Sequence, residues 1–224
     1  MPRERYQDAL EALRDDVLEM GEHVDAQLET ALESLSTGSE SAAQAVIEGD
    51  AEINERYLAL ETDCVDLFAL QQPVAGDLRF VTASFKISTD LERIGDLAVN
   101  LARYARAAER TLEPDVAIDA IGEAVRSLLD RSLEAYAAED AAACRRIAAD
   151  DDEVDGLCQR ASETVTRGLI ERNVDDDPWA IERLLDDVSR VLLTIRDLER
   201  IADHAVNVAA RTLYMIDGDP ELIY

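Results

Sequence analysis

Apolar side chains recur along this chain at intervals of three and four residues, which is the spacing of one face of an α-helix. The clearest run consists of Leu10, Leu13, Val17, Met20, Val24, Leu28, Ala31 and Leu35. The alternation of β-branched and polar residues that is typical of strands is absent from the sequence. Because only 9 glycines and 5 prolines interrupt the pattern, the sequence predicts an all-α protein built from long helices.

Start and stop signals divide the pattern into six helices. Ser41 with Gln44 resembles a capping box, Asp140 is a candidate N-cap, and prolines at 73, 114 and 178 stand where first-turn prolines belong. Gly218 and Pro220 close the last helix. The expected helices span about residues 3–35, 41–72, 73–109, 114–138, 140–172 and 178–216.

Two segments of the chain are nearly the same. DLERIGDLAVNLA at 90–102 and DLERIADHAVNVA at 197–209 differ at three of thirteen positions. A weaker match pairs residues 46–54 with residues 147–155. The halves are therefore two copies of one unit, and we expect two tandem antiparallel three-helix bundles, at 1–111 and 112–224.

Oxygen-bearing side chains follow one another at intervals of four residues in both copies, so that each set shares one helix face. The sets are Glu92, Asp96 and Asn100 in the first copy, and Glu199, Asp203 and Asn207 in the second. A single helix offers too few ligands for tight metal binding, so a neighbouring helix must contribute. The pairs at the same spacing that can do so are Asp50 with Asn54, and Asp151 with Asp155.

These oxygens suit hard or borderline cations. The competing interpretation is that the carboxylates are solvated or form salt bridges with Arg93 and Arg200. Leu91 and Ile94 belong to the opposite, apolar side of the helix, so a metal cluster would lie on the outer face of its bundle. That position disfavours a di-iron oxidase, whose ligands project into the bundle interior, and no Glu-x-x-His motif occurs.

Composition narrows the classes of partner. The chain has 50 acidic and 22 basic residues, a formal net charge of -28, and one lysine, Lys86. Such a charge disfavours nucleic acid and anionic membrane surfaces as partners and is typical of a halophilic, salt-adapted protein. No apolar run is long enough to span a bilayer and no signal peptide opens the chain, so we expect a cytoplasmic protein without direct membrane insertion.

The cysteines, the histidines and the tryptophan are expected to have structural rather than chemical roles. The three widely spaced cysteines, Cys64, Cys144 and Cys158, fit small core residues better than disulfides. His23 shows no acidic partner pattern and is expected at the surface. His204 replaces Leu97 of the first copy and is expected to pack, with metal ligation as the alternative; Trp179 is expected to anchor the start of the last helix.

The repeated motifs, together with CVDLFALQQPVAGDLRF at 64–80 and the following Lys86-Ile87, resemble the PhoU family of phosphate-signalling proteins nearly end to end. The resemblance implies tandem three-helix bundles, frequent homodimers, and metal sites at the acidic motifs. The cation would be a divalent or trivalent ion such as Fe, Mn, Zn or Mg.

The resemblance also implies a non-enzymatic negative regulator. Its partners would be the ATPase subunit of a phosphate ABC importer, a sensor or another regulatory protein, and phosphate could bind through the metal. Two alternatives remain open on the residues alone: a metal-dependent helical-bundle enzyme, and a structural adaptor without metal.

Overall fold

Six long α-helices account for almost all of the described residues. The computed structural model describes residues 2–70, 75–108, 116–171, 178–218 and 220–222, and within these ranges it contains no β-strand. The all-α prediction is confirmed. The helices are α1 (Pro2–Thr37), α2 (Glu40–Leu70), α3 (Ala75–Ala107), α4 (Ile118–Ala138), α5 (Ala141–Glu171) and α6 (Pro178–Asp217).

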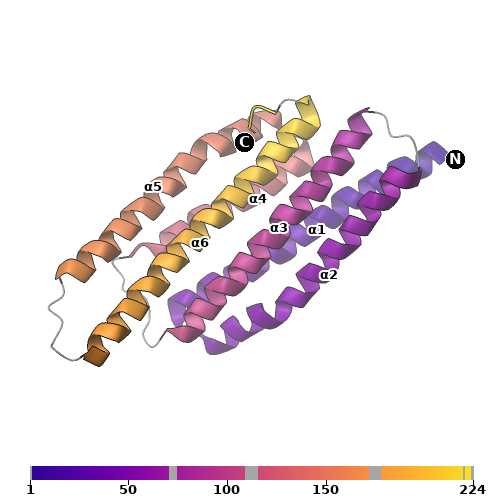
Figure 1. Ribbon diagram of the computed structural model, residues 1–224. Coiled ribbons are helices and arrows are strands. Elements are labelled where there is room, and N and C mark those ends of the chain that lie inside the picture. Colours follow the sequence, from indigo (N-terminus) through magenta and orange to yellow (C-terminus); the bar gives the residue numbers. More distant parts are fainter. Residues whose placement is uncertain (1, 71–74, 109–115, 172–177, 219, 223–224) are drawn as a thin grey trace.

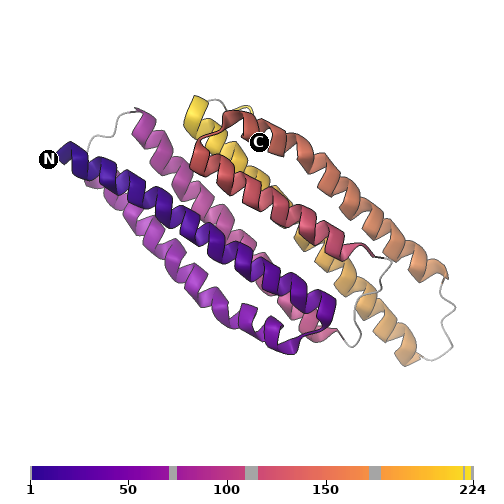
Figure 2. The ribbon, with the colours of Figure 1, turned by 180° about the vertical axis from the view of Figure 1, so that it is seen from behind.

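The helices form two antiparallel three-helix bundles that lie side by side. Helices α1, α2 and α3 pack against one another, and so do α4, α5 and α6. The bundles meet where α3 packs on α6 and α1 packs on α4. Figure 1 shows α3 and α6 adjacent on one face, and Figure 2 shows α1 and α4 adjacent on the other. Helices α2 and α5 are left at opposite edges of the molecule (Figure 1).

Helix ends agree with the sequence signals in part. Asp140 does cap α5, since its Oδ1 accepts hydrogen bonds of 2.9 Å from the backbone N–H groups of Ala142 and Ala143. The capping box at Ser41 is wrong. The cap of α2 is Ser39, whose hydroxyl accepts from the N–H of Ala42 at 3.2 Å and leaves Ser41 inside the first turn.

The other helix ends lie within a few residues of the positions expected from the sequence. α4 begins at Ile118 and ends at Ala138, and the next residue, Glu139, adopts a left-handed conformation with φ 51°. Gly218, with φ +68°, follows the end of α6 as expected. Residues 71–74, 109–115 and 172–177 lie outside the described residues, and with them Pro73, Pro114 and the loop before α6. The division of the chain at residue 111 therefore stays a prediction.

The core follows the predicted apolar faces. Every member of the run from Leu10 to Leu35 is buried, and so are Cys64, Cys144 and Cys158, which are free thiols. The expectation that the cysteines are core residues is confirmed. Trp179, which was expected to anchor the start of α6, is 70% exposed.

Glycines allow the two bundles to approach closely at the α1–α4 contact. A Cβ at Gly21 would lie 2.7 Å from the methyl groups of Leu133, and a Cβ at Gly122 would lie 2.7 Å from a methyl group of Leu32. The two contacts are equivalent under the repeat, since both pairs of positions are offset by 101 residues. The bundles are thus related by an approximate internal two-fold symmetry.

The α3–α6 contact has the same symmetry but contains buried polar groups. Asp90 on α3 accepts a hydrogen bond from His204 Nδ1 at 2.9 Å, and it lies 3.9 Å from Arg211. Its repeat counterpart Asp197, fully buried on α6, accepts from the hydroxyl of Tyr104 at 2.9 Å. Each aspartate therefore joins its own bundle to the other.

Candidate functional site

The first acidic set spans the seam between α2 and α3. Asp50 and Asn54 lie one turn apart on α2, where the Asn54 amide donates to Asp50 Oδ2 at 3.0 Å. Burial and the charge of Asp96 on α3 raise the pKa of Asp50. Burial and the charges of Asp96 and Asp50 likewise raise the pKa of Glu92. The charges of Asp50, Glu92 and Asp96 therefore act on one another across the seam, and Asn54 is hydrogen-bonded to one of them.

The second acidic set occupies the equivalent seam between α5 and α6. Burial and the neighbouring charge of Asp155 raise the pKa of Glu199 and of Asp203. Asp151 is the most perturbed carboxyl group, with burial and then Asp155 raising its pKa to about 6. Its Oδ1 is buried and has no hydrogen-bond partner. Four carboxylates that repel one another thus share this seam.

The two asparagines at the ends of the motifs behave differently from the carboxylates. Asn100 is half-buried on α3, one turn beyond Asp96. Asn207 donates a hydrogen bond of 3.4 Å to Asp90 of the other bundle. Asn207 therefore serves the contact between the bundles as well as lying one turn beyond Asp203.

Arginine neutralises the first acidic set more than the second. Arg93 lies 3.1 Å from Asp96 and 3.5 Å from Glu92. Arg200, its counterpart in the repeat, lies 3.7 Å from the buried Asp197 instead. On α3 the motif therefore forms the salt bridges that the competing interpretation expects. On α6 the arginine instead pairs with Asp197, the first residue of the repeated segment.

In the described part of the chain, no three His, Cys, Asp or Glu side chains converge tightly enough to form a metal site as they stand. The donors nevertheless fit hard cations in kind, since they are carboxylate and amide oxygens from two helices of each bundle. Both sets are partly exposed, opposite the buried Leu91 and Ile94 on α3 and opposite Leu198 and Ile201 on α6. The predicted outward orientation is confirmed for the carboxylates, whereas Asn207 is directed to the other bundle.

Sequence reasoning missed the role of Asp90. The conserved spacing between the two copies offered a signal, because Asp90 and Asp197 open the same DLER motif. His204 packs against the other bundle and pairs with Asp90, so the packing expectation for this histidine is confirmed.

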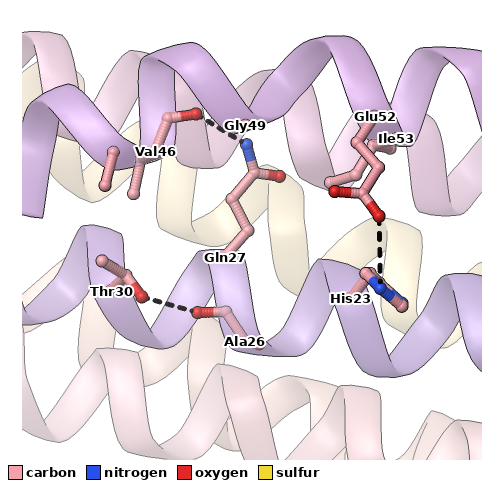
Figure 3. Close-up of a pocket in the computed structure, with 9 residues that line it drawn as sticks. His23, Ala26, Gln27, Thr30, Val46, Gly49, Glu52 and Ile53 are labelled. Atoms are coloured by element: carbon pink, nitrogen blue, oxygen red, sulfur yellow. Dashed lines mark hydrogen bonds and ion pairs between the residues drawn. The ribbon is translucent and has the colours of Figure 1, made fainter.

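A shallow hollow of about 220 Å³ lies between α1 and α2, and Figure 3 shows its lining. Gln27 donates to the carbonyl oxygen of Val46 at 3.1 Å, and His23 lies 3.5 Å from Glu52. The expectation that His23 lacks an acidic partner is wrong, since Glu52 reaches it from the neighbouring helix. Most of the remaining lining is aliphatic, so the hollow presents little chemistry beyond this pair.

No helix among the described residues is both long enough and apolar enough to cross a membrane.

These observations define a class of protein: tandem, internally duplicated three-helix bundles with an acidic seam in each copy. The family model described as "PhoU domain" matches this chain twice, at residues 17–105 and 118–212. The chain belongs to the PhoU family.

Known relatives resemble the chain over nearly its whole length. The phosphate-specific transport system accessory protein PhoU homolog of Pseudomonas putida is 34% identical over 218 residues, which cover 96% of this chain and 82% of the relative. The crystal structure of PhoU from Pseudomonas aeruginosa has a TM-score of 0.86 and 33% identity, and the alignment covers 96% of this chain and 100% of that one. A phosphate transport system regulatory protein PhoU from Streptococcus pneumoniae also has a TM-score of 0.86, at 25% identity, with 96% and 98% of the chains covered.

Proposed function

We propose that this protein is a cytoplasmic, non-enzymatic regulator that restrains phosphate uptake and phosphate-dependent signalling. The observation that carries the proposal is the match to phosphate transport accessory and regulatory proteins across nearly the whole chain, in both bundles. The protein acts by contact, with the ATPase subunit of a phosphate importer or with a sensor or regulatory protein. It functions as a homodimer.

The two acidic seams are proposed to hold metal ions, with Mg, Mn, Fe and Zn as the candidate metals. Support comes from the raised pKa values of Asp50 and Asp151, which arise first from burial and then from the charges of neighbouring carboxylates, a repulsion that a cation would relieve. The unpartnered Oδ1 of Asp151 adds a buried oxygen that a cation would satisfy. The first set consists of Asp50, Asn54, Glu92, Asp96 and Asn100, and the second of Asp151, Asp155, Glu199, Asp203 and Asn207.

A bound cation would also explain how so acidic a protein could respond to phosphate. At a net charge of -28 the surface repels anions. A cation held in a seam reverses the local field and supplies a coordination position for a phosphate oxygen. We propose this route for phosphate rather than a direct site made of arginines.

The regulatory role is tested by removing the protein from its organism and measuring the uptake of radiolabelled phosphate in phosphate-rich medium. We expect faster uptake without the protein and normal uptake when the parent chain is restored. Unchanged uptake and unchanged phosphate-dependent expression in its absence would overturn the regulatory proposal.

The metal proposal is tested by elemental analysis of protein purified in high salt without chelator. The test variant changes Glu92, Asp96, Glu199 and Asp203 to alanine. A control variant of identical charge change alters exposed carboxylates outside the seams, namely Glu11, Asp15, Glu123 and Asp130. We expect near-stoichiometric metal in the parent and control and its loss from the seam variant; equal metal in all three proteins would show that the seams are not the sites.

A further inference from the structure

The outer face of α2 carries an apolar stripe that none of the other described helices covers. Leu58, Val65 and Phe68 follow one another at intervals of seven and three residues and so share one helix face. Their exposed fractions are 58%, 57% and 39%. Among the described helices, α2 packs on α1 and α3 alone, and it lies at an edge of the molecule (Figure 1). The stripe therefore faces away from both bundles.

The repeat shows that the fold does not need apolar residues at two of the three stripe positions. Helix α5 occupies the equivalent edge of the second bundle, at an offset of 101 residues (Figure 1). There Gln159 stands in place of Leu58 and Thr166 in place of Val65, and both are exposed, whereas the apolar Leu169 stands in place of Phe68. One copy of the unit thus keeps polar residues where the other exposes leucine and valine. Adjacent exposed aliphatic residues of this kind typically mark an interaction surface.

Acidic side chains border the stripe. On the helix, Glu55 and Asp66 lie along one side of it and Glu61 along the other. Arg56, the one basic residue of α2, is engaged by Glu19 and Glu52 at 2.9 and 3.2 Å. Within the described residues, none of the three bordering carboxylates pairs with an arginine. The corresponding positions on α5 are Gly156, Arg167 and Ser162, so the acidic border is also specific to α2.

We propose that the stripe is the docking surface for a basic amphipathic helix of a partner protein. The apolar side chains of such a helix would cover Leu58, Val65 and Phe68, while its lysines or arginines would face the bordering carboxylates. A second copy of this chain fits this stripe less well, because it would place one acidic border against another. The proposal deepens the adaptor role given above and rests on it only in that the protein acts through a partner.

The test uses the full chain and a fluorescent synthetic helix of about 18 residues, with leucines on one face and lysines and arginines beside them. Binding is followed by fluorescence anisotropy in matched high-salt buffer. The test variant, Leu58→Gln with Val65→Thr, takes the residues that α5 already tolerates and leaves the net charge unchanged. We expect it to weaken binding about tenfold or more, because two half-exposed aliphatic contacts are lost.

Two controls separate the stripe from general attraction to an acidic protein. Leu185→Gln removes another exposed aliphatic side chain, on α6, and should leave the affinity within about twofold. A second helix with the same leucines but glutamates in place of the basic residues should not bind. Equal binding of the basic helix to parent and stripe variant, or equal binding of both helices to the parent, would overturn the proposal.

A variant of the acidic border provides an independent check that does not alter the apolar residues. Changing all three carboxylates to amides should weaken the binding of the basic helix. The same number of changes on α4 should leave that binding unchanged. The border variant is Glu55→Gln, Glu61→Gln and Asp66→Asn, and its match is Glu123→Gln, Glu134→Gln and Asp130→Asn. Equal affinities of the two variants would count against a basic partner.

Further measurements distinguish the outcomes. Sedimentation of the parent and the stripe variant tests the second-copy alternative: a parent dimer that the stripe variant loses, without any binding of the basic helix, would overturn the proposal. Metal content and phosphate uptake are measured on the same variant. If the stripe variant keeps its metal but no longer restrains phosphate uptake, the docking surface is supported. If it keeps its metal and still restrains phosphate uptake, the docking surface is refuted, and the regulatory proposal is unaffected.

Discussion

One hydrogen bond between two hydroxyl groups joins the bundles, and its contribution to the free energy of unfolding can be measured. The hydroxyl of Ser84 on α3 lies 2.8 Å from the hydroxyl of Tyr136 on α4, and both residues are fully buried. Burial raises the pKa of Tyr136 to about 12, so the group stays neutral at any pH of interest. The pair is therefore a hydrogen bond without charge, and salt should not screen it.

The expected cost depends on which hydroxyl is left behind. Tyr136→Phe leaves the Ser84 hydroxyl, which can turn to a carbonyl one helical turn earlier, so we expect a loss of about 1 kcal/mol. Ser84→Ala leaves the buried Tyr136 hydroxyl without its partner, so we expect a loss of about 2 kcal/mol. The double variant removes both hydroxyls and should cost less than the sum of the single changes by about 1 kcal/mol or more.

The assay is urea unfolding followed by circular dichroism, in one high-salt buffer for all four proteins, since salt keeps the acidic surface screened. The quantity of interest is the coupling free energy from the double-mutant cycle. If the costs of the single changes add within about 0.3 kcal/mol, the two hydroxyls do not stabilise each other and the reasoning is refuted.

Three further predictions concern the helix cap, the glycines and the acidic seam. Ser39→Ala should lower the free energy of unfolding by about 1 kcal/mol because it removes the cap of α2, whereas Ser41→Ala should change it by less than about 0.5 kcal/mol; equal losses in urea unfolding would contradict the assignment. Gly122→Val should cost about 1–3 kcal/mol because the added carbons would meet a leucine of the other bundle, whereas Gly49→Ala, with open space around it, should gain about 0.5–1 kcal/mol; a stabilised valine variant would refute the close approach. In metal-free protein the folded Asp151 carboxyl, with a pKa of about 6, holds its proton more tightly than the unfolded chain at 3.8. Its contribution to stability should therefore fall as the pH rises from about 4 to 6, and stay low above that; a stability difference between parent and Asp151→Asn that does not change over this window would contradict the shift.

Much of the fold could be predicted because helix periodicity and duplication are local properties of the sequence. The apolar face of α1 is continuous from Leu10 to Leu35, and each of its predicted positions is buried. The near-identity of the two DLER segments implied two copies before any packing was known. Helix ends were less certain, because several serines near a terminus can supply the cap, and the choice of Ser39 over Ser41 depends on one residue of register.

The candidate site could be predicted only as far as single helices allow. Intervals of four residues place Glu92 and Asp96 on one face, and the same spacing on α2 identifies Asp50. That these groups come near enough to raise one another's pKa values depends on how α2 and α3 pack. The 70% exposure of Trp179 could not be predicted for the same reason, since it depends on which helices reach the start of α6.

The sequence by itself determined the helices, their apolar and acidic faces, the duplication and the family, because each of these is written in the spacing and identity of neighbouring residues. Only the tertiary structure decided how the two copies meet, with Asp90 directed to His204, Asp197 to Tyr104, and the glycines of α1 and α4 receiving leucines across the contact. Those contacts join residues about a hundred positions apart, and helical periodicity carries no information on the rotation of one packed helix against another. The same holds for the apolar stripe of α2, which is visible as a pattern in the sequence but is known to be exposed only once its neighbours are in place.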